Sequence, residues 1–420
     1  LLVAGHAGDE GLLLLALLPA SPALAIDLEV GRWIELKATH PQGVPLHQQP
    51  RPSLMGRAPD AARAEVRAMD QAQHWIQIRL EDGRVAWIIE NYVERVVEAP
   101  SPPSGSTGND EWLVWGSGDG CRQVVGAGRR MAVLQASLVR MGTWNIRWFP
   151  DETDLDWLAC TIGWMNLDLL VVVEIRDTPE ARAAMGRVRD ALRTVSGATW
   201  EVDLHRCGPA RSQHVGFLWR TDRVTLSEFA DRWHFNARAT AESSPCAKGL
   251  RPGRYAYVKA TGDGVDFHAI VVHLKSGSTP AARQERMTVV NRLDEAVADL
   301  LARDRDIVIL GDFNTMGTGS PGSAVEELQI MATIVTVKAP GFTRLTVEPP
   351  CTEYYRGHGG WLDHVLVSRE MQEAPRAAAR VTGYCAVKSC ATIGDEKPAA
   401  YEQLSDHCPV VFQIDHRDLD

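Results

Sequence analysis

The sequence predicts a small all-β domain followed by a larger domain of mixed α/β (α+β) class. Residues 30–97 hold short apolar runs separated by turn residues, a pattern typical of short strands. From Leu138 onward, apolar strand-like runs alternate with segments of helical periodicity. Residues 99–110 between these parts are rich in Pro, Ser and Gly, as flexible linkers are. A chain of 420 residues is long enough for both domains.

The composition is that of a globular protein, with 45% hydrophobic and 23% charged residues, which argues against global disorder. The formal net charge of −10 gives a polyanionic substrate no overall attraction. Residues 201–259, however, hold ten Lys or Arg and six Asp or Glu, which predicts a local basic patch. No stretch is long and apolar enough to span a bilayer, so we expect no transmembrane segment, and we expect a monomer.

Residues 1–25 are predicted to be a signal peptide. Leu12–Leu18 is a short apolar run, and an Ala-x-Ala cleavage pattern ends at Ala25. The segment before this run has no Lys or Arg and no initiator Met, so we expect a start that is truncated or misassigned. The alternative is a disordered apolar leader. We favour export to the periplasm or the medium.

The cysteines fit an exported protein with some disulfides. There are eight, and none shows C-x-x-C spacing, so a structural zinc site is not indicated. Cys385 and Cys390 are close enough in sequence to close a small loop. Cys207 and Cys246 are proposed as a second pair, and Cys408 is interpreted as a buried thiol within an apolar run.

Residues 30–97 are predicted to form a small barrel. The expected strands are Trp33–Leu36, Gly43–His47, Ala64–Ala68, His74–Leu80 and Val85–Ile89. Asp82-Gly83 is a strong hairpin turn signal. The pattern Trp75…Asp82-Gly83…Ala86-Trp87 resembles that of bacterial SH3-like domains, with Ala86 in place of the usual glycine. The resemblance implies an adaptor for the cell wall or another surface ligand, and a purely structural barrel is the alternative.

Residues 98–137 are predicted to be linker and cover. Tryptophans and Cys121 indicate an ordered segment, whereas Gly116–Gly120 indicate a loop. Beyond it, strands are expected at Val139–Asn145, Leu169–Val173, Val215–Trp219, Ala256–Lys259, Phe267–Leu274, Ile307–Leu310, Trp361–Val367 and Pro409–Ile414. Helices are expected at 155–165 and, as one amphipathic segment, at 287–301.

The stretch Ile307–Thr315 carries the first chemical signal. Four apolar residues run into Gly311, followed by Asp312 and Asn314. Residues two apart on an extended chain point to the same side, so this acid and amide face one spot. Such a pair suits a metal-bound phosphate and the water that attacks it. A polar turn after a core strand is the alternative.

Other apolar strands also carry polar residues at or near their ends. These are Asn145, Glu174, His273, Asp363, and Asp406 with His407. Each alone has an ordinary structural explanation, as a turn residue, a solvated strand end or a core histidine. Those explanations do not account for the recurrence of polar residues at the ends of several strands. Carboxylates and amides suit Mg²⁺, and imidazoles suit proton transfer.

Six motifs in order resemble those of the endonuclease/exonuclease/phosphatase superfamily. They are Thr143-Trp144-Asn145, Glu174, Val272–Ser276, Gly311–Asn314, Trp361–Val365 and Ser405–His407. The resemblance covers residues 138–415, although Glu174 lacks the Gln that often precedes it. It implies a four-layer sandwich of two mixed sheets flanked by helices, with a divalent metal at one end.

The resemblance also implies roles. Glu174 is the main metal ligand, with Asn145 and Asp406 nearby, and Mg²⁺ is the expected cofactor, with Mn²⁺ or Ca²⁺ as alternatives. Asp312 orients or deprotonates the attacking water, and Asn314 holds a phosphate oxygen. His407 contacts the scissile phosphate, His273 is a general acid or base, and Asp363 helps to place the metal or His273. Asp203 is the candidate carboxylate that orients His273 and raises its pKa.

The substrate is expected to be nucleic acid, because the motif that contains His273 resembles the corresponding motif of the deoxyribonuclease I-like branch. The stretch Arg206, Arg211, Arg220, Arg223, Arg232, Arg238, Arg251 and Arg254 is predicted to supply phosphate contacts. The alternative is that these arginines are dispersed in surface ion pairs. A phospholipid phosphodiesterase is a second interpretation and requires an exposed apolar loop, for which Trp233–Phe235 is the candidate. A surface-binding protein with an inactive catalytic domain is the third.

Overall fold

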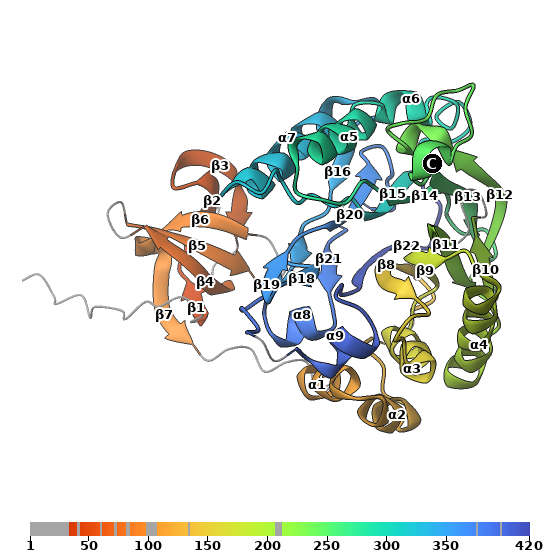
Figure 1. The fold of residues 1–420 in the computed structure, drawn as a ribbon. Coiled ribbons are helices and arrows are strands. Elements are labelled where there is room, and N and C mark those ends of the chain that lie inside the picture. Colours follow the sequence, from red (N-terminus) through yellow and green to blue (C-terminus); the bar gives the residue numbers. More distant parts are fainter. Residues whose placement is uncertain are drawn as a thin grey trace, which may run out of the picture. The chain divides into compact units, whose positions relative to one another are not determined.

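The computed structural model describes residues 33–39, 43–58, 61–70, 74–80, 85–97, 107–132, 135–205, 212–374, 377–394 and 397–420. The chain forms two compact units, Leu1–Gly105 and Ser106–Asp420 (Figure 1). The predicted signal peptide lies outside the described residues, as do most of the linker and the Asp82-Gly83 turn. No helix in the described ranges is long and apolar enough to cross a membrane.

The first unit contains a seven-stranded sheet in the order β3-β2-β6-β5-β4-β1-β7, and the pairings recorded in it are antiparallel. The strands are β1 (Trp33–Leu36), β2 (Val44–Gln49), β3 (Arg51–Ala58), β4 (Arg63–Asp70), β5 (Trp75–Leu80), β6 (Val85–Ile89) and β7 (Val93–Val97). The five predicted strands are present. Two strands, β3 and β7, were not predicted. Alternate residues such as Ile34, Ile76 and Ile78 fill the core of this unit.

The second unit contains two larger sheets. One has the order β10-β11-β9-β8-β22-β21-β17, and the other β12-β13-β14-β15-β20-β16. The first comprises β8 (Leu138–Phe149), β9 (Leu169–Arg176), β10 (Trp200–Leu204), β11 (Gln213–Arg220), β17 (Val347–Glu348), β21 (Ala379–Val381) and β22 (Val410–Asp415). The second comprises β12 (Val224–Arg232), β13 (Gly253–Ala260), β14 (Asp266–His273), β15 (Ile307–Asp312), β16 (Phe342–Arg344) and β20 (Asp363–Ser368). A separate hairpin joins β18 (Glu353–Tyr355) to β19 (His358–Gly360).

The two sheets face each other across one core, and helices cover their outer faces (Figure 1). Val171 from one sheet and Val271 and Leu310 from the other lie in the same buried cluster. A second cluster lies between the outer face of the β15 sheet and α5, α6 and α7. The helices are α3 (Leu155–Met165), α4 (Pro179–Ser196), α5 (Pro280–Val290), α6 (Leu293–Val297), α7 (Ser323–Val337), α8 (Tyr384–Val387) and α9 (Ala399–Gln403). The expected four-layer sandwich is confirmed.

Residues 107–126 form two helices, α1 (Thr107–Gly116) and α2 (Gly118–Gly126), which belong to the second unit. The loop predicted at Gly116–Gly120 is wrong. Only Ser117 separates the helices, and its hydroxyl accepts a hydrogen bond from the Gly120 amide at the start of α2. The cover expected from the tryptophans is present, because Trp115 packs edge-on against Trp144 of β8.

The single helix predicted at 287–301 is also wrong. The chain instead forms α5, which begins earlier behind an N-cap at Thr279, and the short α6. Asn291 ends α5, and its side chain donates to the Met287 carbonyl. An apolar stripe reports which side of a segment is buried, and it does not exclude a break between two helices that bury the same side.

Three disulfides join described residues of the second unit: Cys121–Cys160, Cys351–Cys390 and Cys385–Cys408. The small loop expected between Cys385 and Cys390 is therefore wrong, and Cys408 is bonded rather than a free thiol. Cys207 lies outside the described residues, so its proposed pairing with Cys246 stays a prediction. Sequence spacing could not identify these partners, because each bond joins segments brought together by the tertiary fold.

Gly311, near the end of β15, makes a sharp stability prediction. Its φ of +141° is rare for other residues, and a Cβ added there would lie 2.0 Å from the Val272 carbonyl oxygen of the paired strand β14. Gly311→Ala is expected to lower the free energy of unfolding by about 3 kcal/mol or more, measured by denaturant titration. Gly186→Ala in α4 is the control, because a Cβ added there would meet nothing within 4 Å. This variant should raise the free energy of unfolding by no more than about 1 kcal/mol. Equal stability of the two variants would contradict the clash.

Candidate active site

The polar residues at the strand ends meet at one end of the facing sheets. Strand β8 runs parallel to β9, and β14 runs parallel to β15, so Asn145, Glu174, His273 and Asp312 come from the carboxyl-terminal parts of these strands. Strand β20 runs antiparallel to β15, and its first residue, Asp363, is therefore paired with Asp312. The topology alone brings these side chains together.

Asn145 connects the two sheets. Its Nδ2 lies 3.1 Å from Glu174 Oε1 and 3.0 Å from Asp312 Oδ2, and donates to both carboxylates. The same nitrogen is 3.4 Å from His407 Nε2. Asn145 is 1% exposed, so these bonds form away from bulk water. It therefore holds two acids of opposite sheets in fixed positions.

An irregularity in β8 directs Trp148 toward Glu174. The register between β8 and β9 shifts between Asn145 and Phe149, and Arg147 and Trp148 both have positive φ. The Arg147 amide donates to Asn145 Oδ1 at 3.0 Å, and the Trp148 amide donates to Glu174 Oε2 at 3.2 Å. The bulge thus supplies two backbone donors to the site.

His407 and Asp363 form a buried ion pair. His407 Nδ1 is 2.8 Å from Asp363 Oδ2, and His407 Nε2 is 4.0 Å from Asp312 Oδ2. Burial opposes the charged imidazole, but the charge and hydrogen bond of Asp363, with the charges of Asp312 and Asp406, raise the pKa of His407 well above its ordinary value. Asp363 thus contacts His407 and not His273, whereas its expected part in placing the metal stays a prediction.

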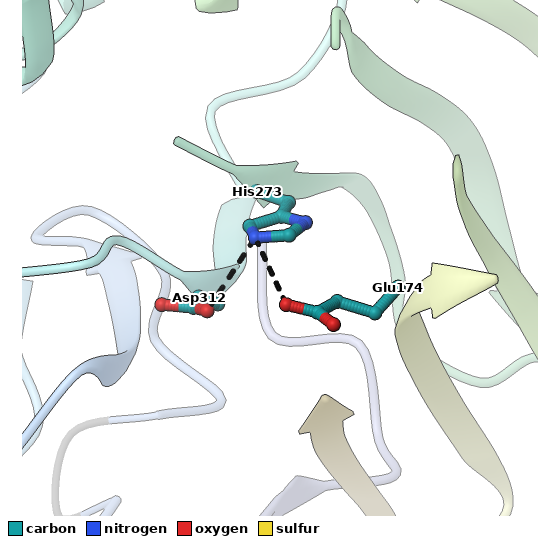
Figure 2. A group of neighbouring side chains, drawn as sticks. All are labelled: Glu174, His273 and Asp312. Carbon is teal, nitrogen blue, oxygen red and sulfur yellow. Dashed lines mark ion pairs between the residues drawn. The ribbon is translucent and has the colours of Figure 1, made fainter. Parts of the chain in front are cut away.

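His273 lies between Glu174 and Asp312 (Figure 2). Its Nε2 is 3.7 Å from Glu174 Oε1 and 3.6 Å from Asp312 Oδ2. Burial, and after it the charge of Arg251, lower the pKa of His273 well below its ordinary value, the opposite of the predicted direction. The candidate Asp203 was also wrong, because both of its oxygens bind Arg254.

Asp312 and Asn314 are both buried. Asp312 Oδ1 accepts a 2.8 Å hydrogen bond from the Asn314 amide, and Asn314 Nδ2 donates to the Leu274 carbonyl at 3.2 Å. Burial, with the neighbouring charges of Asp363 and Glu174, raises the pKa of Asp312 to about 7. The carboxylate is therefore poised to exchange a proton near neutral pH.

Comparison with known protein families identifies the family of the chain. The family model described as the Endonuclease/Exonuclease/phosphatase family matches residues 142–407. The chain belongs to the endonuclease/exonuclease/phosphatase family. Members of this family are hydrolases that act on phosphoester bonds.

Several solved structures resemble the chain at low identity. A Bacteroides thetaiotaomicron family protein is 14% identical, with a TM-score of 0.45, covering 68% of this chain and 100% of that one. A Bacteroides vulgatus endonuclease/exonuclease/phosphatase is 16% identical, with a TM-score of 0.43 and coverage of 68% and 100%. The human Nocturnin catalytic domain is 15% identical, with a TM-score of 0.44 and coverage of 68% and 96%. No curated protein matches the chain.

The residues at this site of the family fold fit a divalent cation. Single ligand atoms of Glu174, His273 and Asp312 lie within 4.8 Å of one another, as do those of Asp312, Asp363 and His407. Asp363 Oδ1 is buried and has no hydrogen-bond partner in the described part of the chain. An excess of buried carboxylate oxygens with an unpaired acceptor is the donor set that hard cations require.

Glu353 was missed by the sequence analysis. It is 5% exposed and lies in β18, where its backbone forms an isolated bridge with His407. Burial, with the charges of Asp406, Asp312 and Asp363, raises the pKa of Glu353 to about 8. Asp406 is partly exposed, and its carboxylate accepts a 3.4 Å hydrogen bond from the Ser405 hydroxyl. Glu353 follows no apolar strand run, so the pattern that identified the other acids could not reveal it.

The predicted basic patch is wrong for the described arginines. Five of them pair with acids: Arg220 with Asp222, Arg223 with Asp168, Arg232 with Asp299, Arg238 with Glu285, and Arg254 with Asp203 and Asp231. Arg206 and Arg211 lie outside the described residues. Arg251 instead donates to the carbonyls of His273 and Leu274, at 3.0 and 2.7 Å. It supports the end of β14 and is not available to a substrate phosphate.

Proposed function

We propose that the second unit is a divalent-metal-dependent phosphodiester hydrolase that cleaves nucleic acid. The observation that carries the substrate class is the position of Trp148. Its amide donates to Glu174, while its side chain is among the exposed large apolar ones, with 43% of its surface accessible. The guanidinium of Arg176 lies 4.7 Å from the ring centroid. An exposed aromatic ring with a cation beside it is a platform on which a nucleobase stacks.

The roles of the site residues follow from their charges. His407 is held as an imidazolium by Asp363, so it is suited to contact the scissile phosphate and offset the charge that develops there. Asp312, with a pKa of about 7, is suited to accept a proton from the attacking water. His273, kept neutral by burial, can accept or donate one hydrogen bond at the reacting group. Asn314 keeps its second amide hydrogen for a phosphate oxygen.

Glu174, Asn145 and Asp406 are proposed to hold the cation, Mg²⁺ or alternatively Mn²⁺ or Ca²⁺. When bound, the ion supplies Lewis-acid polarisation of the phosphate and neutralises part of its charge. Glu174 is suited to the main contact, since among the described residues its carboxylate oxygens accept hydrogen bonds only from the Trp148 amide and from Asn145 Nδ2.

A phospholipid substrate is less well supported. The candidate apolar loop Trp233–Phe235 is a short 3-10 helix in which Phe235 is 3% exposed. Trp233 stacks on His234 at 4.0 Å between centroids, with Arg292 5.5 Å from its ring centroid. This segment is packed against the protein and does not present an apolar loop to a lipid surface.

The test is hydrolysis by the purified chain of plasmid DNA, RNA, sphingomyelin and inositol phosphates, with Mg²⁺, Mn²⁺, Ca²⁺ or EDTA. We expect DNA or RNA to be cleaved with a divalent cation and left intact in EDTA. Hydrolysis of sphingomyelin with both nucleic acids intact would overturn the substrate class. Failure on every substrate with every metal would support the interpretation as an inactive surface-binding protein.

The stacking role of Trp148 has its own test. Trp148→Ala is expected to raise KM for an oligonucleotide by about 5- to 150-fold, the range for losing one stacked base, with kcat nearly unchanged. Trp148→Phe keeps an aromatic face and should stay close to the wild type. Hydrolysis of bis(p-nitrophenyl) phosphate should be the same in all three proteins. An equal loss on that small substrate would mean that Trp148 acts through Glu174 and not through a base.

The first unit is proposed to be an SH3-like adaptor for a cell-wall or surface ligand, in a protein that is secreted or periplasmic. The disulfides support an oxidising compartment. None of the proposed site residues lies before residue 138, so deletion of residues 26–105 should leave kcat on a soluble substrate nearly unchanged. A large fall in kcat would assign the first unit a part in the active site.

A further inference from the structure

A second group of acids lies at the opposite end of β15 from the active site. Asp304 and Asp306 precede β15, whose last residue is the catalytic candidate Asp312. Six strand residues separate the two ends by roughly 20 Å. The group also includes Glu373, Asp418 and Asp420. It is therefore distinct from the active site in position and in composition, since it contains no imidazole.

Within this group the ligand atoms are close together. Single oxygens of Asp304, Asp306 and Asp420 lie within 4.8 Å of one another, and so do those of Glu373, Asp418 and Asp420. Asp420 belongs to both sets, so the five carboxylates form one continuous cluster. The chain contributes them from three separate segments: the approach to β15, the loop after β20, and the segment after β22.

The two innermost acids have carboxylate oxygens that no hydrogen-bond donor reaches. Asp306 is 1% exposed, and neither of its carboxylate oxygens accepts a hydrogen bond from an N–H or O–H donor in the described part of the chain. Glu373 is 2% exposed, and its Oε2 is also without a partner, while Oε1 accepts from the Leu419 amide at 2.6 Å. Among the described residues, no Lys, Arg or His forms an ion pair with any of the five acids. Buried acceptors that are left unsatisfied are costly unless a cation or a proton fills the space between them.

We propose that Asp304, Asp306, Glu373, Asp418 and Asp420 form a structural binding site for Ca²⁺. The ligands are all carboxylates from segments outside the strands. Ca²⁺ accepts six to eight oxygens in variable geometry, as mono- or bidentate carboxylates allow. Mg²⁺ requires a stricter octahedron and keeps more of its water. Zinc prefers nitrogen and sulfur ligands, which the cluster does not contain.

The pKa shifts are consistent with this site. Burial, then a hydrogen bond of the protonated carboxyl with Glu373 and the charges of Glu373, Asp304 and Asp420, raise the pKa of Asp306 to about 9, and burial raises that of Asp304 to about 6. Without a cation, therefore, Asp306 holds a proton at neutral pH. A bound Ca²⁺ takes the place of that proton and allows the carboxylates to lie together in their ionised form.

The site would fasten the segment after β22 across both sheets. The segment after β22 forms an isolated bridge between Arg417 and Gly264 in the turn before β14, and Figure 1 shows the C-terminus beside β14. The His416 amide donates to the Ser137 carbonyl just before β8, and the His416 carbonyl accepts from the Val265 amide. Asp418 and Asp420 follow directly. Asp420 lies close to Asp304 and Asp306, which precede β15 of the other sheet, and Asp418 lies close to Glu373. Ca²⁺ would thus join the two sheets at the end that the catalytic residues do not occupy.

The test is calcium binding by the full chain in which Glu174→Gln has removed the main ligand proposed for the catalytic cation. After EDTA treatment and dialysis, Ca²⁺ at about a hundredfold excess over Kd is expected to raise Tm by about 5 °C or more. Calorimetric titration should show one site. Hydrogen exchange should show greater protection of residues 415–420 when Ca²⁺ is present.

Adding Asp306→Asn or Glu373→Gln should abolish the Tm shift, and each variant should melt above its parent in EDTA because one buried carboxyl has been removed. The double variant Asp418→Asn, Asp420→Asn leaves the buried acids in place and should weaken Ca²⁺ binding at least about tenfold. This result does not depend on whether the Asp306→Asn and Glu373→Gln variants fold. Glu242→Gln removes an exposed acid outside the cluster and should keep the full shift. No Tm shift with Ca²⁺ would overturn the proposal, as would a shift that survives both core variants.

Discussion

Glu174→Gln is expected to abolish divalent-metal-dependent hydrolysis, with a fall in kcat/KM on the order of 10³-fold or more. The substitution keeps the shape of the side chain and removes the charge that the cation requires. Glu174 accepts from the Trp148 amide at Oε2 and from Asn145 Nδ2 at Oε1, so the single oxygen of the glutamine amide keeps one of these two bonds while the side chain keeps its shape. The fold should therefore be retained, as circular dichroism and Tm would show.

Binding of Mn²⁺, followed by electron paramagnetic resonance, separates loss of metal from loss of chemistry. The variant should bind Mn²⁺ more weakly than the wild type at the catalytic site. Glu201→Gln on β10 is a matched control, because Glu201 is an exposed glutamate and makes no contact with the site residues. Near-normal turnover of Glu174→Gln would remove the metal assignment.

His407→Ala is expected to lower kcat by about 10²–10⁴-fold, the range for a positioned acid–base group. Asp363→Asn should also lower kcat, by about 10²-fold, because the imidazole loses the carboxylate that holds its charge and orientation. The control is His268→Ala: His268 is a fully buried histidine of β14 whose Nδ1 is 2.9 Å from the Tyr255 hydroxyl. That variant should lose stability and keep kcat per folded molecule. If His407→Ala behaves like it, His407 is only a core residue.

The same pair predicts the direction of the pH dependence. The pKa of His407 is raised in the folded protein, so the charged form stabilises the fold fully below the unfolded value of about 6.5. This stabilisation is lost as pH rises through the pKa of His407 in the folded protein. Activity that requires the His407 imidazolium is lost over the same range. Asp363→Asn should move the alkaline limb of the kcat profile to lower pH. An unmoved alkaline limb would mean that another group controls it.

Much of the active site could be predicted because it follows from local sequence and simple topology. A strand such as β15 is recognisable from four consecutive apolar residues, and its polar end is then in a known place. Parallel neighbours bring such ends to the same edge. Asn145, Glu174, His273 and Asp312 converge for this reason.

The partners of the site residues could not be predicted in the same way. Whether Asp363 binds His273 or His407 depends on which sheet edge each side chain faces, and the order along the chain does not contain that information. The arginine stretch failed similarly, because Arg232 finds Asp299 and Arg254 finds Asp203 only in the folded molecule. Glycines at 116–120 favoured a loop on local grounds, but packing of α1 and α2 against β8 and α3 overrides that propensity.

The bond between Cys385 and Cys408 matters for how the protein is made. Cys408 directly follows His407, and its backbone amide donates to the Thr352 carbonyl, next to Glu353. Protein synthesised in a reducing cytoplasm would lack this covalent restraint on the segment that carries the imidazole. Such material should fold with a more mobile His407 and show a lower specific activity than material secreted through an oxidising compartment. Preparations from different expression routes would then differ in turnover despite an identical sequence.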